Sequence, residues 1–373
     1  MISPRVAFGS LVGFVAVLSC VNLVRNRTSG SSNGVHHRNV RQLLGIDPRS
    51  VRTKRKDALQ CFNSDAPLAP EDANDAFRGH TIYMLGDSTI RQQFHQLCRM
   101  MDGSINLPSD DHVFRKATLI EPLNEDTVGN RAEYVRLCQT DSTRIAFAGT
   151  NQHGLHQPGG LSLIHDVLAK HDAVTGEQHR TKPTVVYVNG GLHYVQLRPY
   201  WFHKLFNWAT IETFTSQFVE AVNSMFGPSV RVIYMKSHAM CEEKYTKEQA
   251  EAVKEFMADP VGFSKPCVDY VDDQKRNNGF PSNADSLMIC QSSMLTTQGV
   301  YDVNSRITKT LAQPNNLDLP IGCVDGFEAT LGKCDETRDG KHYEAMVRYE
   351  LMSLAQSIHS VNNMQSSEVR VLK

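Results

Sequence analysis

The chain has 373 residues, of which 40% are hydrophobic and 21% are charged, a composition typical of globular proteins. Its formal net charge of −1 provides no basic field for a nucleic acid, so we expect no nucleic-acid partner. The 15 histidines lack the spacing of metal ligands, and no repeat of fixed period is present, which argues against a metal site and against a repeat architecture.

The chain begins with a hydrophobic segment. After a short flank at residues 1–5, residues 6–24 contain no charged side chain, and arginines stand on both sides of them. A bilayer is spanned by about 20 apolar residues, so residues 6–24 are predicted to form an uncleaved transmembrane signal anchor. Two alternatives are a cleaved signal peptide and a lipoprotein cleavage box ending at Cys20. The hydrophobic region is unusually long for a signal peptide, and no clear cleavage site follows it.

Two opposing signals bear on the orientation of this anchor. Lys and Arg are denser after the anchor than before it, which taken alone would place the body of the protein in the cytosol. The cysteines after Cys20 are even in number and contain no C-x-x-C pair, which favours disulfides in a luminal or extracellular domain. They are Cys61, Cys98, Cys138, Cys241, Cys267, Cys290, Cys323 and Cys334. We therefore expect a single-pass membrane protein whose main domain lies in the Golgi or secretory lumen or outside the cell.

The remainder of the chain divides into a stem, a folded domain and a tail. Residues 25–60 are rich in Arg, Ser, Gly, His and Asn, so a flexible basic stem is predicted. Residues 61–360 are expected to fold, and residues 361–373 to form a C-terminal tail. Strand-like runs cover 81–85, 144–148, 184–188, 230–235 and, more weakly, 286–290, whereas helical patterns cover 89–101, 161–170, 211–226, 247–257 and 342–359. Short apolar runs between longer helices predict a three-layer α/β/α fold with a central, mostly parallel sheet.

Two further segments carry local signals. Thr246 and Gln249 have the spacing of a capping box for the helix at 247–257. Residues 259–284 are polar and rich in Gly and Pro, which predicts a long excursion, either a lid or a disulfide-tied surface loop.

Gly86, Asp87 and Ser88 lie where the first strand-like run passes into a helical pattern. In parallel α/β sheets, functional residues collect at the carboxyl ends of the strands. A Ser at this position could attack a carbonyl carbon while its own backbone N–H helps to hold the resulting oxyanion. The alternative is that Asp87 or Ser88 merely caps the helix, which is common for these residue types.

The C-terminal region offers a base for such a serine. Asp339 and His342 are three residues apart, with Gly340 between them, and this turn can project both side chains toward one point. Asp339 would then orient the imidazole so that its other nitrogen takes the proton of Ser88. The alternative is a surface turn in which Asp339 is a helix cap.

A third segment, "TVVYVNGGLHYV", ends a strand-like run with an Asn followed by two glycines. The amide of Asn189 is a suitable donor to an oxyanion, and the glycines allow the backbone to approach a substrate closely. The alternative is an ordinary turn, since Asn and Gly are common turn residues. His193 is a second candidate base, and is equally consistent with an ordinary loop histidine.

These three segments, in this order, resemble the SGNH hydrolase (GDSL-like) superfamily. "LGDSTIRQQF", "VVYVNGGLHY" and "DGKHY" are similar in particular to the PC-esterase branch. That branch includes trichome-birefringence-like proteins, the capsule- and sialic-acid-modifying O-acetyltransferase domains, and neurexophilin-with-PC-esterase proteins. The resemblance covers residues 60–360, although its specific motifs are confined to the three segments. It implies a flavodoxin-like SGNH fold.

The resemblance also implies roles for individual residues. Ser88 would be the nucleophile, His342 the base and Asp339 its orienting partner, while the Ser88 backbone N–H and Asn189 would hold the oxyanion. The superfamily takes a further oxyanion donor from a glycine in a second motif. Gly149 is the candidate here, and Gly154 and Gly160 are alternatives, because the match to that motif is poor.

Two residues near Ser88 are expected to support the site. Arg91 matches the branch pattern and would brace the loop or meet an acyl donor, and its alternative is an ordinary exposed helical arginine. Asp87 is expected beside the nucleophile in the same supporting role. The resemblance implies no metal.

An activated serine with an oxyanion hole carries out acyl transfer through a covalent acyl-enzyme. Water as the acceptor gives an esterase, whereas a sugar hydroxyl gives an O-acyltransferase. The branch implies acetyl groups on carbohydrate, so we expect a glycan O-acetyltransferase or acetylesterase without a bound cofactor. A transferase would need an acetyl donor such as acetyl-CoA, which a multi-pass membrane partner would supply. The alternative is a catalytically inactive membrane protein that binds glycans or acts as a scaffold.

Overall fold

The computed structural model describes residues 59, 61–101, 135–140, 142–148, 159–175, 181–190, 192–195, 208–277, 279–313 and 319–371. The chain divides into two units, Met1–Thr53 and Lys54–Lys373, and every described residue belongs to the second. The predicted anchor at 6–24 and nearly all of the predicted stem at 25–60 therefore lie outside the described residues. Within the described ranges, no helix combines the length and the apolar character needed to cross a membrane.

A seven-stranded sheet forms the centre of the second unit, in the order β1-β7-β6-β5-β2-β4-β3. Neighbouring strands run parallel except β3 and β4, which pair antiparallel. The strands are β1 (Cys61–Phe62), β2 (Thr81–Leu85), β3 (Val135–Gln139), β4 (Arg144–Ala148), β5 (Val185–Asn189), β6 (Arg231–Met235) and β7 (Ile321–Val324). The predicted runs at 81–85 and 144–148 coincide with β2 and β4, and those at 184–188 and 230–235 differ from β5 and β6 by one residue.

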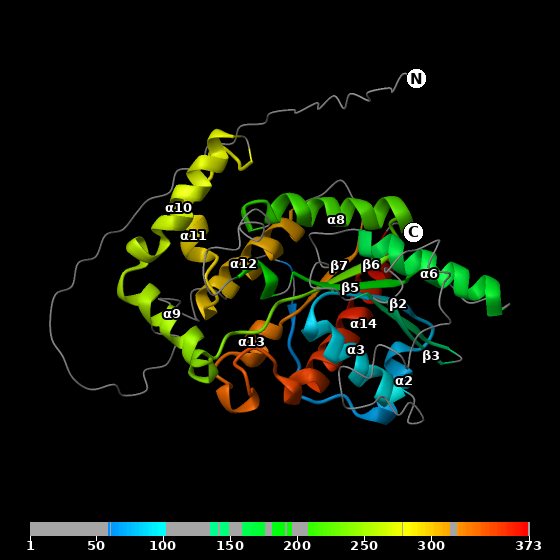
Figure 1. Ribbon diagram of the computed structural model, residues 1–373. Coiled ribbons are helices and arrows are strands. Elements are labelled where there is room, and N and C mark those ends of the chain that lie inside the picture. Colours follow the sequence, from blue (N-terminus) through cyan, green and yellow to red (C-terminus); the bar gives the residue numbers. More distant parts are fainter. Residues whose placement is uncertain are drawn as a thin grey trace, which may run out of the picture. The chain divides into compact units, whose positions relative to one another are not determined.

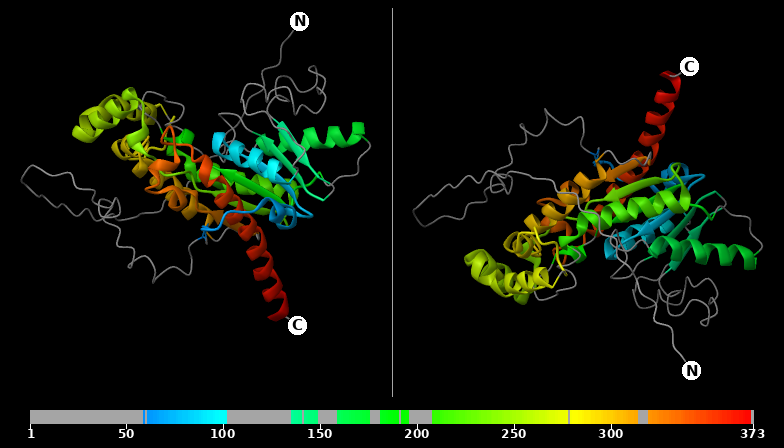
Figure 2. Two further views of the ribbon diagram at one scale, coloured as in Figure 1. Left: turned by 90° about the horizontal axis from the view of Figure 1, so that it is seen from below. Right: turned by 90° about the horizontal axis from the view of Figure 1, so that it is seen from above.

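Helices cover both faces of the sheet, as Figure 1 shows. On one face lie α6 (Gly159–Thr175), α8 (Ile211–Phe226) and α12 (Thr297–Leu311). On the other face lie α2 (Pro70–Phe77), α3 (Ser88–Met101) and α14 (Val347–Val371). Figure 2 presents α3 and α14 nearest the viewer in its left view and α8 nearest in its right view. The predicted three-layer α/β/α architecture is confirmed.

Strands β2, β4 and β5 are buried along their whole length, which explains their largely apolar sequences. In β2, Tyr83 and Leu85 belong to the core cluster on the α8 side, whereas Ile82 and Met84 belong to the cluster on the α3 side. Because successive side chains of a strand point to opposite faces, one strand contributes to both cores. The sheet is therefore a buried platform, and polar side chains are available mainly at the ends of its strands.

The remaining helices lie between β6 and the C terminus. Among the described residues they are α9 (Lys247–Ala258), α10 (Pro260–Arg276), α11 (Ser286–Ser292) and α13 (Gly326–Thr330), with the short 3₁₀ turns η3 (Glu242–Lys244), η4 (Cys334–Glu336) and η5 (Glu344–Met346). A further 3₁₀ turn, η2 (Leu192–Tyr194), follows β5. The predicted capping box of α9 is confirmed, since Thr246 accepts from the Gln249 backbone N–H and the Gln249 side chain accepts from the Thr246 backbone N–H.

Two predictions in this region are wrong. Residues 286–290 form part of helix α11 instead of a strand, and the side chain of Asp285 caps that helix by accepting from the Met288 backbone N–H at 3.0 Å. A short apolar run such as residues 287–290 cannot by itself distinguish a strand from a buried helix. Residues 259–284 do not form a long loop, because α10 occupies most of them. Asp259 caps α10, and Pro260 stands at its first position, where no backbone donor is needed.

Three disulfides connect distant parts of the domain: Cys61–Cys323, Cys241–Cys334 and Cys267–Cys290. The last ties α10 to α11, so the predicted disulfide tie of that segment is confirmed even though the segment is helical. Cys98 and Cys138 belong to none of the three and are buried in one apolar cluster. Six of the eight expected cysteines are therefore paired, which indicates an oxidising compartment of the secretory or extracellular kind.

Candidate active site

Ser88, Asn189 and the turn at 339–342 meet at the carboxyl ends of the parallel strands. Ser88 follows β2 and is the first residue of α3, and Asn189 is the last residue of β5. The turn approaches from the C-terminal part of the chain, immediately before η5 and α14. The predicted helix at 342–359 was placed too early, since α14 begins at Val347 and His342 lies in the turn. The three sequence segments are therefore neighbours in space.

Ser88 does not serve as the helix cap, because Asp87 takes that role. The Asp87 side chain accepts a hydrogen bond from the Thr89 backbone N–H at 2.9 Å. The Ser88 hydroxyl instead points to His342, with 2.5 Å between Ser88 Oγ and His342 Nε2. The sequence left open whether this corner provides a helix cap or a nucleophile. Adjacent residues take the two positions: Asp87 caps α3, and Ser88 faces the imidazole.

Asp339 completes a chain of three polar side chains. Its Oδ2 lies 2.6 Å from His342 Nδ1. Burial raises the pKa of Asp339, but hydrogen bonds from the His342 ring and from nearby backbone N–H groups outweigh this effect and lower the pKa to about 2. An ionised carboxylate beside Nδ1 requires a proton on Nδ1, so the lone pair of Nε2 faces the Ser88 hydroxyl. This is the tautomer that can accept the serine proton.

The backbone of the turn is shaped to hold this geometry. Gly340 has φ +78°, and a Cβ at Gly340 would overlap with the Cys241 carbonyl oxygen and the Tyr245 ring. Asp339 Oδ1 accepts from the backbone N–H groups of Lys341 at 3.0 Å and His342 at 2.9 Å. Asp339 is therefore both a local backbone acceptor and the partner of the His342 ring. One carboxylate therefore makes both sets of contacts that the sequence suggested: Oδ1 accepts from the backbone of the turn, and Oδ2 contacts the imidazole.

The turn is also tied to the segment that follows β6. The Cys241 backbone N–H donates to the Gly340 carbonyl at 2.9 Å, and Cys241 forms a disulfide with Cys334. Both attachments lie close to the triad in sequence: Gly340 lies between Asp339 and His342, and Cys334 lies five positions before Asp339. The sulfurs of Cys241 and Cys334 lie close to the Glu243 carboxylate, but as a disulfide they offer no thiolate to a metal.

Asn189 packs against the Gly86–Ser88 corner. The amide of Asn189 donates to Asp87 Oδ1 at 3.0 Å, and its carbonyl oxygen accepts from the Asp87 backbone N–H at 3.4 Å. A Cβ at Gly86 would overlap with that carbonyl oxygen, so this position needs glycine for a close approach. Asp87 Oδ2 accepts from the Leu192 backbone N–H at 3.0 Å. Asp87 thus joins the ends of β2 and β5, in agreement with its expected supporting position.

The triad is accessible to solvent, whereas its supports are buried. The side chains of His342 and Asp339 are 29% and 51% exposed. Asn189 is 1% exposed and Asp87 7% exposed. A substrate can therefore reach the serine and the imidazole, while the residues that fix the corner stay out of water.

The structure describes only some of the other predicted site residues. Gly149 and Gly154 lie outside the described residues, as does the side chain of His193. Gly160 is the second residue of α6. Arg91 lies on the first turn of α3, where its backbone N–H bonds to the Asp87 carbonyl at 3.1 Å, and its role toward a donor remains a prediction.

Sequence reasoning missed three buried polar residues behind the triad: His238, Glu350 and Gln93. They follow β6, begin α14 and lie within α3, respectively. No motif marks them, because each is an isolated polar residue whose partners are distant in sequence. A further feature is a hollow of about 300 Å³ beside the triad-bearing segment, whose lining includes Lys333, Glu336 and Tyr349 and none of the triad residues.

Comparisons with family models, curated proteins and solved structures find no match to this chain. The geometry of its own residues therefore carries the functional argument.

Proposed function

We propose that this protein is a serine-dependent acyl-transfer enzyme in which Ser88 forms a covalent acyl-enzyme. The supporting observation is the continuous hydrogen-bonded chain from Ser88 Oγ through His342 to the Asp339 carboxylate. A nucleophilic serine requires a base within hydrogen-bond reach and a third group that orients the base, and these three residues meet both requirements.

In the first half of the reaction, His342 Nε2 takes the proton of Ser88 as Oγ attacks the carbonyl carbon of an acetyl ester. Negative charge then develops on the carbonyl oxygen. The proposed donors to this oxyanion are the Ser88 backbone N–H at the start of α3 and the second N–H of the Asn189 amide, whose first N–H is bonded to Asp87 Oδ1. Collapse of the tetrahedral intermediate breaks the ester bond, and His342 returns the proton to the departing alcohol.

In the second half, a hydroxyl attacks the acetyl group on Ser88 while His342 takes the proton of that hydroxyl. The Ser88 Oγ–acyl bond breaks, and Oγ recovers the proton from His342. Water as the acceptor releases acetate, whereas a sugar hydroxyl yields a new acetyl ester. The reaction is therefore an esterase or an O-acetyltransferase reaction according to its acceptor.

The proposed substrate is a carbohydrate that carries or receives acetyl groups, in the Golgi or elsewhere in the secretory pathway. Support comes from the resemblance of the three motifs to the PC-esterase branch of the SGNH superfamily, to which we assign the chain as part of this proposal. The three disulfides agree with an oxidising compartment. As a transferase, the enzyme would use an activated donor such as acetyl-CoA, delivered by a multi-pass membrane partner.

The direct test is replacement of Ser88 by Ala, with acetate release from an aryl acetate as the readout. We expect the rate to fall at least about 10³-fold, because no nucleophile would remain at the corner. Ser286→Ala is the matched control, since Ser286 is also the first residue of a helix, α11, and it should keep the wild-type rate.

Equal rates for wild type and S88A, both well above buffer, would overturn the assignment of Ser88. A wild-type rate no higher than buffer, with an isolated acetylated glycan as well as with the aryl ester, would favour a glycan-binding or scaffold protein over an enzyme.

A further inference from the structure

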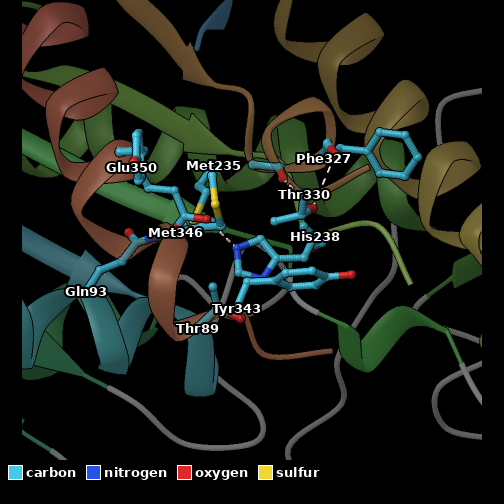
Figure 3. Close-up of polar contacts among 12 residues, drawn as sticks. Thr89, Gln93, Met235, His238, Phe327, Thr330, Tyr343, Met346 and Glu350 are labelled. Atoms are coloured by element: carbon cyan, nitrogen blue, oxygen red, sulfur yellow. Dashed lines mark hydrogen bonds and ion pairs between the residues drawn. The ribbon is translucent and has the colours of Figure 1, made fainter. Parts of the chain in front are cut away.

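Three polar side chains lie buried behind the triad without touching the atoms that react. His238 is 1% exposed, Glu350 is 1% exposed and Gln93 is 0% exposed. Figure 3 shows the carboxylate of Glu350 between the amide of Gln93 and the imidazole of His238. Burying ionisable groups is unfavourable unless each is paired and hydrogen-bonded. A group of this kind beside the triad therefore calls for an explanation.

The hydrogen bonds of this group connect α3, which carries Ser88, to the turn that carries His342. Gln93 Nε2, on the same helix as Ser88, donates to Glu350 Oε2 at 2.6 Å. Glu350 Oε1 lies 2.5 Å from His238 Nε2. His238 Nδ1 in turn lies 3.2 Å from the backbone carbonyl oxygen of Lys341, the residue before His342.

The partners of His238 define its protonation. A carbonyl oxygen can only accept, so Nδ1 carries a proton, while Nε2 faces a carboxylate oxygen. Burial disfavours the charged imidazole, but the Glu350 carboxylate outweighs burial and holds the pKa of His238 above its usual value, with a contribution from the Lys341 carbonyl. These contacts favour the form of His238 that donates through both ring nitrogens. The Tyr343 ring packs edge-on against it, with 5.2 Å between the ring centroids.

The Lys341 carbonyl belongs to the same peptide unit as the His342 backbone N–H. That N–H donates to Asp339 Oδ1 at 2.9 Å, so this peptide is held at both of its polar ends. A peptide unit is planar and rigid, and fixing both ends fixes the direction from which the His342 side chain leaves the backbone. The position of the imidazole over Ser88 then depends on His238 as well as on Asp339.

We propose that His238, Glu350 and Gln93 form a clamp that positions His342 for proton transfer with Ser88. The clamp joins α3, the segment after β6 and the start of α14. Its members act through the Lys341 carbonyl and are positioning residues. The proposal rests on the proposed function, because it requires His342 to act as the base of Ser88.

Replacement of Glu350 by Gln in the full-length chain tests the clamp. The change keeps the shape of the side chain but removes the carboxylate that holds His238 in its doubly donating form. We expect kcat for an aryl acetate to fall about 10- to 100-fold, the range for displacement of a catalytic group by about 1 Å, with KM changed far less. His238→Gln is the second variant and should lower kcat in the same way.

Asp172→Asn is the matched control. Asp172 pairs with Arg144 at the opposite edge of the sheet, and its side chain is 12% exposed. Both Glu350→Gln and Asp172→Asn remove the charge of one largely buried carboxylate, so both should lower Tm. The clamp predicts that kcat falls in E350Q and stays at the wild-type value in D172N. The clamp also predicts that kcat of the double variant H238Q/E350Q equals that of the less active single variant, because the two residues act as one unit.

Two results would overturn the clamp. One is a wild-type kcat in E350Q or H238Q accompanied by a Tm as low as that of D172N, which would leave the group a purely structural role. The other is a ¹⁵N NMR spectrum at pH 7 in which the His238 ring has a single protonated nitrogen. The NMR measurement does not depend on turnover. Failure of the proposed function would instead appear as equal rates for wild type and S88A, so the two failures are distinguishable.

Discussion

Polar side chains lie at both ends of the parallel strands, which we call the amino edge and the carboxyl edge of the sheet. Their hydrogen-bonded arrangements differ between the two edges. At the amino edge, where the strands begin, Arg144 donates to both carboxylate oxygens of Asp172, at 2.6 and 2.9 Å, and the Thr181 hydroxyl donates to Asp172 at 3.0 Å. At the carboxyl edge, the chain of hydrogen bonds from Asp339 ends on the Ser88 hydroxyl, beside a His342 side chain that is 29% exposed. Similar chemistry thus forms a closed ion pair at one edge and an accessible nucleophile with its base at the other.

The partly buried His80 and the buried His238 show the same contrast. At the amino edge, burial together with nearby Arg231 and His359 lowers the pKa of His80 to about 4. At the carboxyl edge, the Glu350 carboxylate outweighs burial and raises the pKa of His238. Burial lowers the pKa of both rings, and only at His238 does a neighbouring carboxylate reverse the sign of the shift. The carboxyl edge therefore favours the charged form of its imidazole, whereas the amino edge favours the neutral form of its own.

Asp339→Asn should have the largest effect on this contrast. An amide at this position no longer favours the tautomer of His342 that accepts the serine proton, so kcat should fall about 10⁴-fold. The readout is acetate release from an aryl acetate, compared with D172N at the amino edge. Wild-type activity in D339N would remove Asp339 from the site and leave it as a turn residue.

Breaking the disulfide at the carboxyl edge should have the next largest effect. Cys241 and Cys334 are 93 residues apart, and loss of a native disulfide typically costs about 2–5 kcal/mol of stability. We expect the variant C241S/C334S to lose stability in urea unfolding and also to lose kcat, because Cys241 is bonded to the turn through the Gly340 carbonyl.

The matched comparison is C267S/C290S, which opens the disulfide between α10 and α11. This variant should lose stability and keep the wild-type kcat. Equal losses of kcat in both double variants would show that the disulfides act on the whole domain and have no special connection to the turn.

The smallest expected effect concerns the amino edge and pH. The folded-state pKa of His80 is about 4 and its ordinary value is 6.5, so the unfolded chain binds a proton between these values that the folded chain does not. Stability therefore falls as the pH is lowered from 6.5 to 4. His80→Asn should weaken this pH dependence in urea unfolding without changing kcat at pH 7. An unchanged pH dependence would mean that His80 does not contribute to it.

The sequence alone could predict strands β2, β4, β5 and β6 and the residues of the triad, because these have local signatures. The β2 run is continuous in apolar residues, and a corner of Gly, Asp and Ser follows it directly. Asp339 and His342 are close in sequence and share one turn, so their pairing needs no knowledge of the fold. The topology then brings Ser88 to them, since parallel strands all end at one edge.

The clamp and several elements could not be predicted for the opposite reason. His238 and Glu350 are 112 residues apart, and nothing in either neighbourhood indicates a partner. Strand β1 has two residues and is held by pairing with β7 and by the Cys61–Cys323 disulfide, contacts that a local pattern cannot reveal. Helix α10 was missed because Gly and Pro usually mark loops, whereas here Pro260 opens the helix and Asp259 caps it.

Covalent labelling would show whether Ser88 is an activated nucleophile. The full-length chain would be treated with a fluorophosphonate, which is attacked by activated serines, and the modified peptide identified by mass spectrometry. We expect one phosphonyl group on Ser88, with labelling abolished in S88A and strongly slowed in D339N. Labelling of another residue, or equal labelling of Ser88 in wild type and D339N, would contradict this expectation.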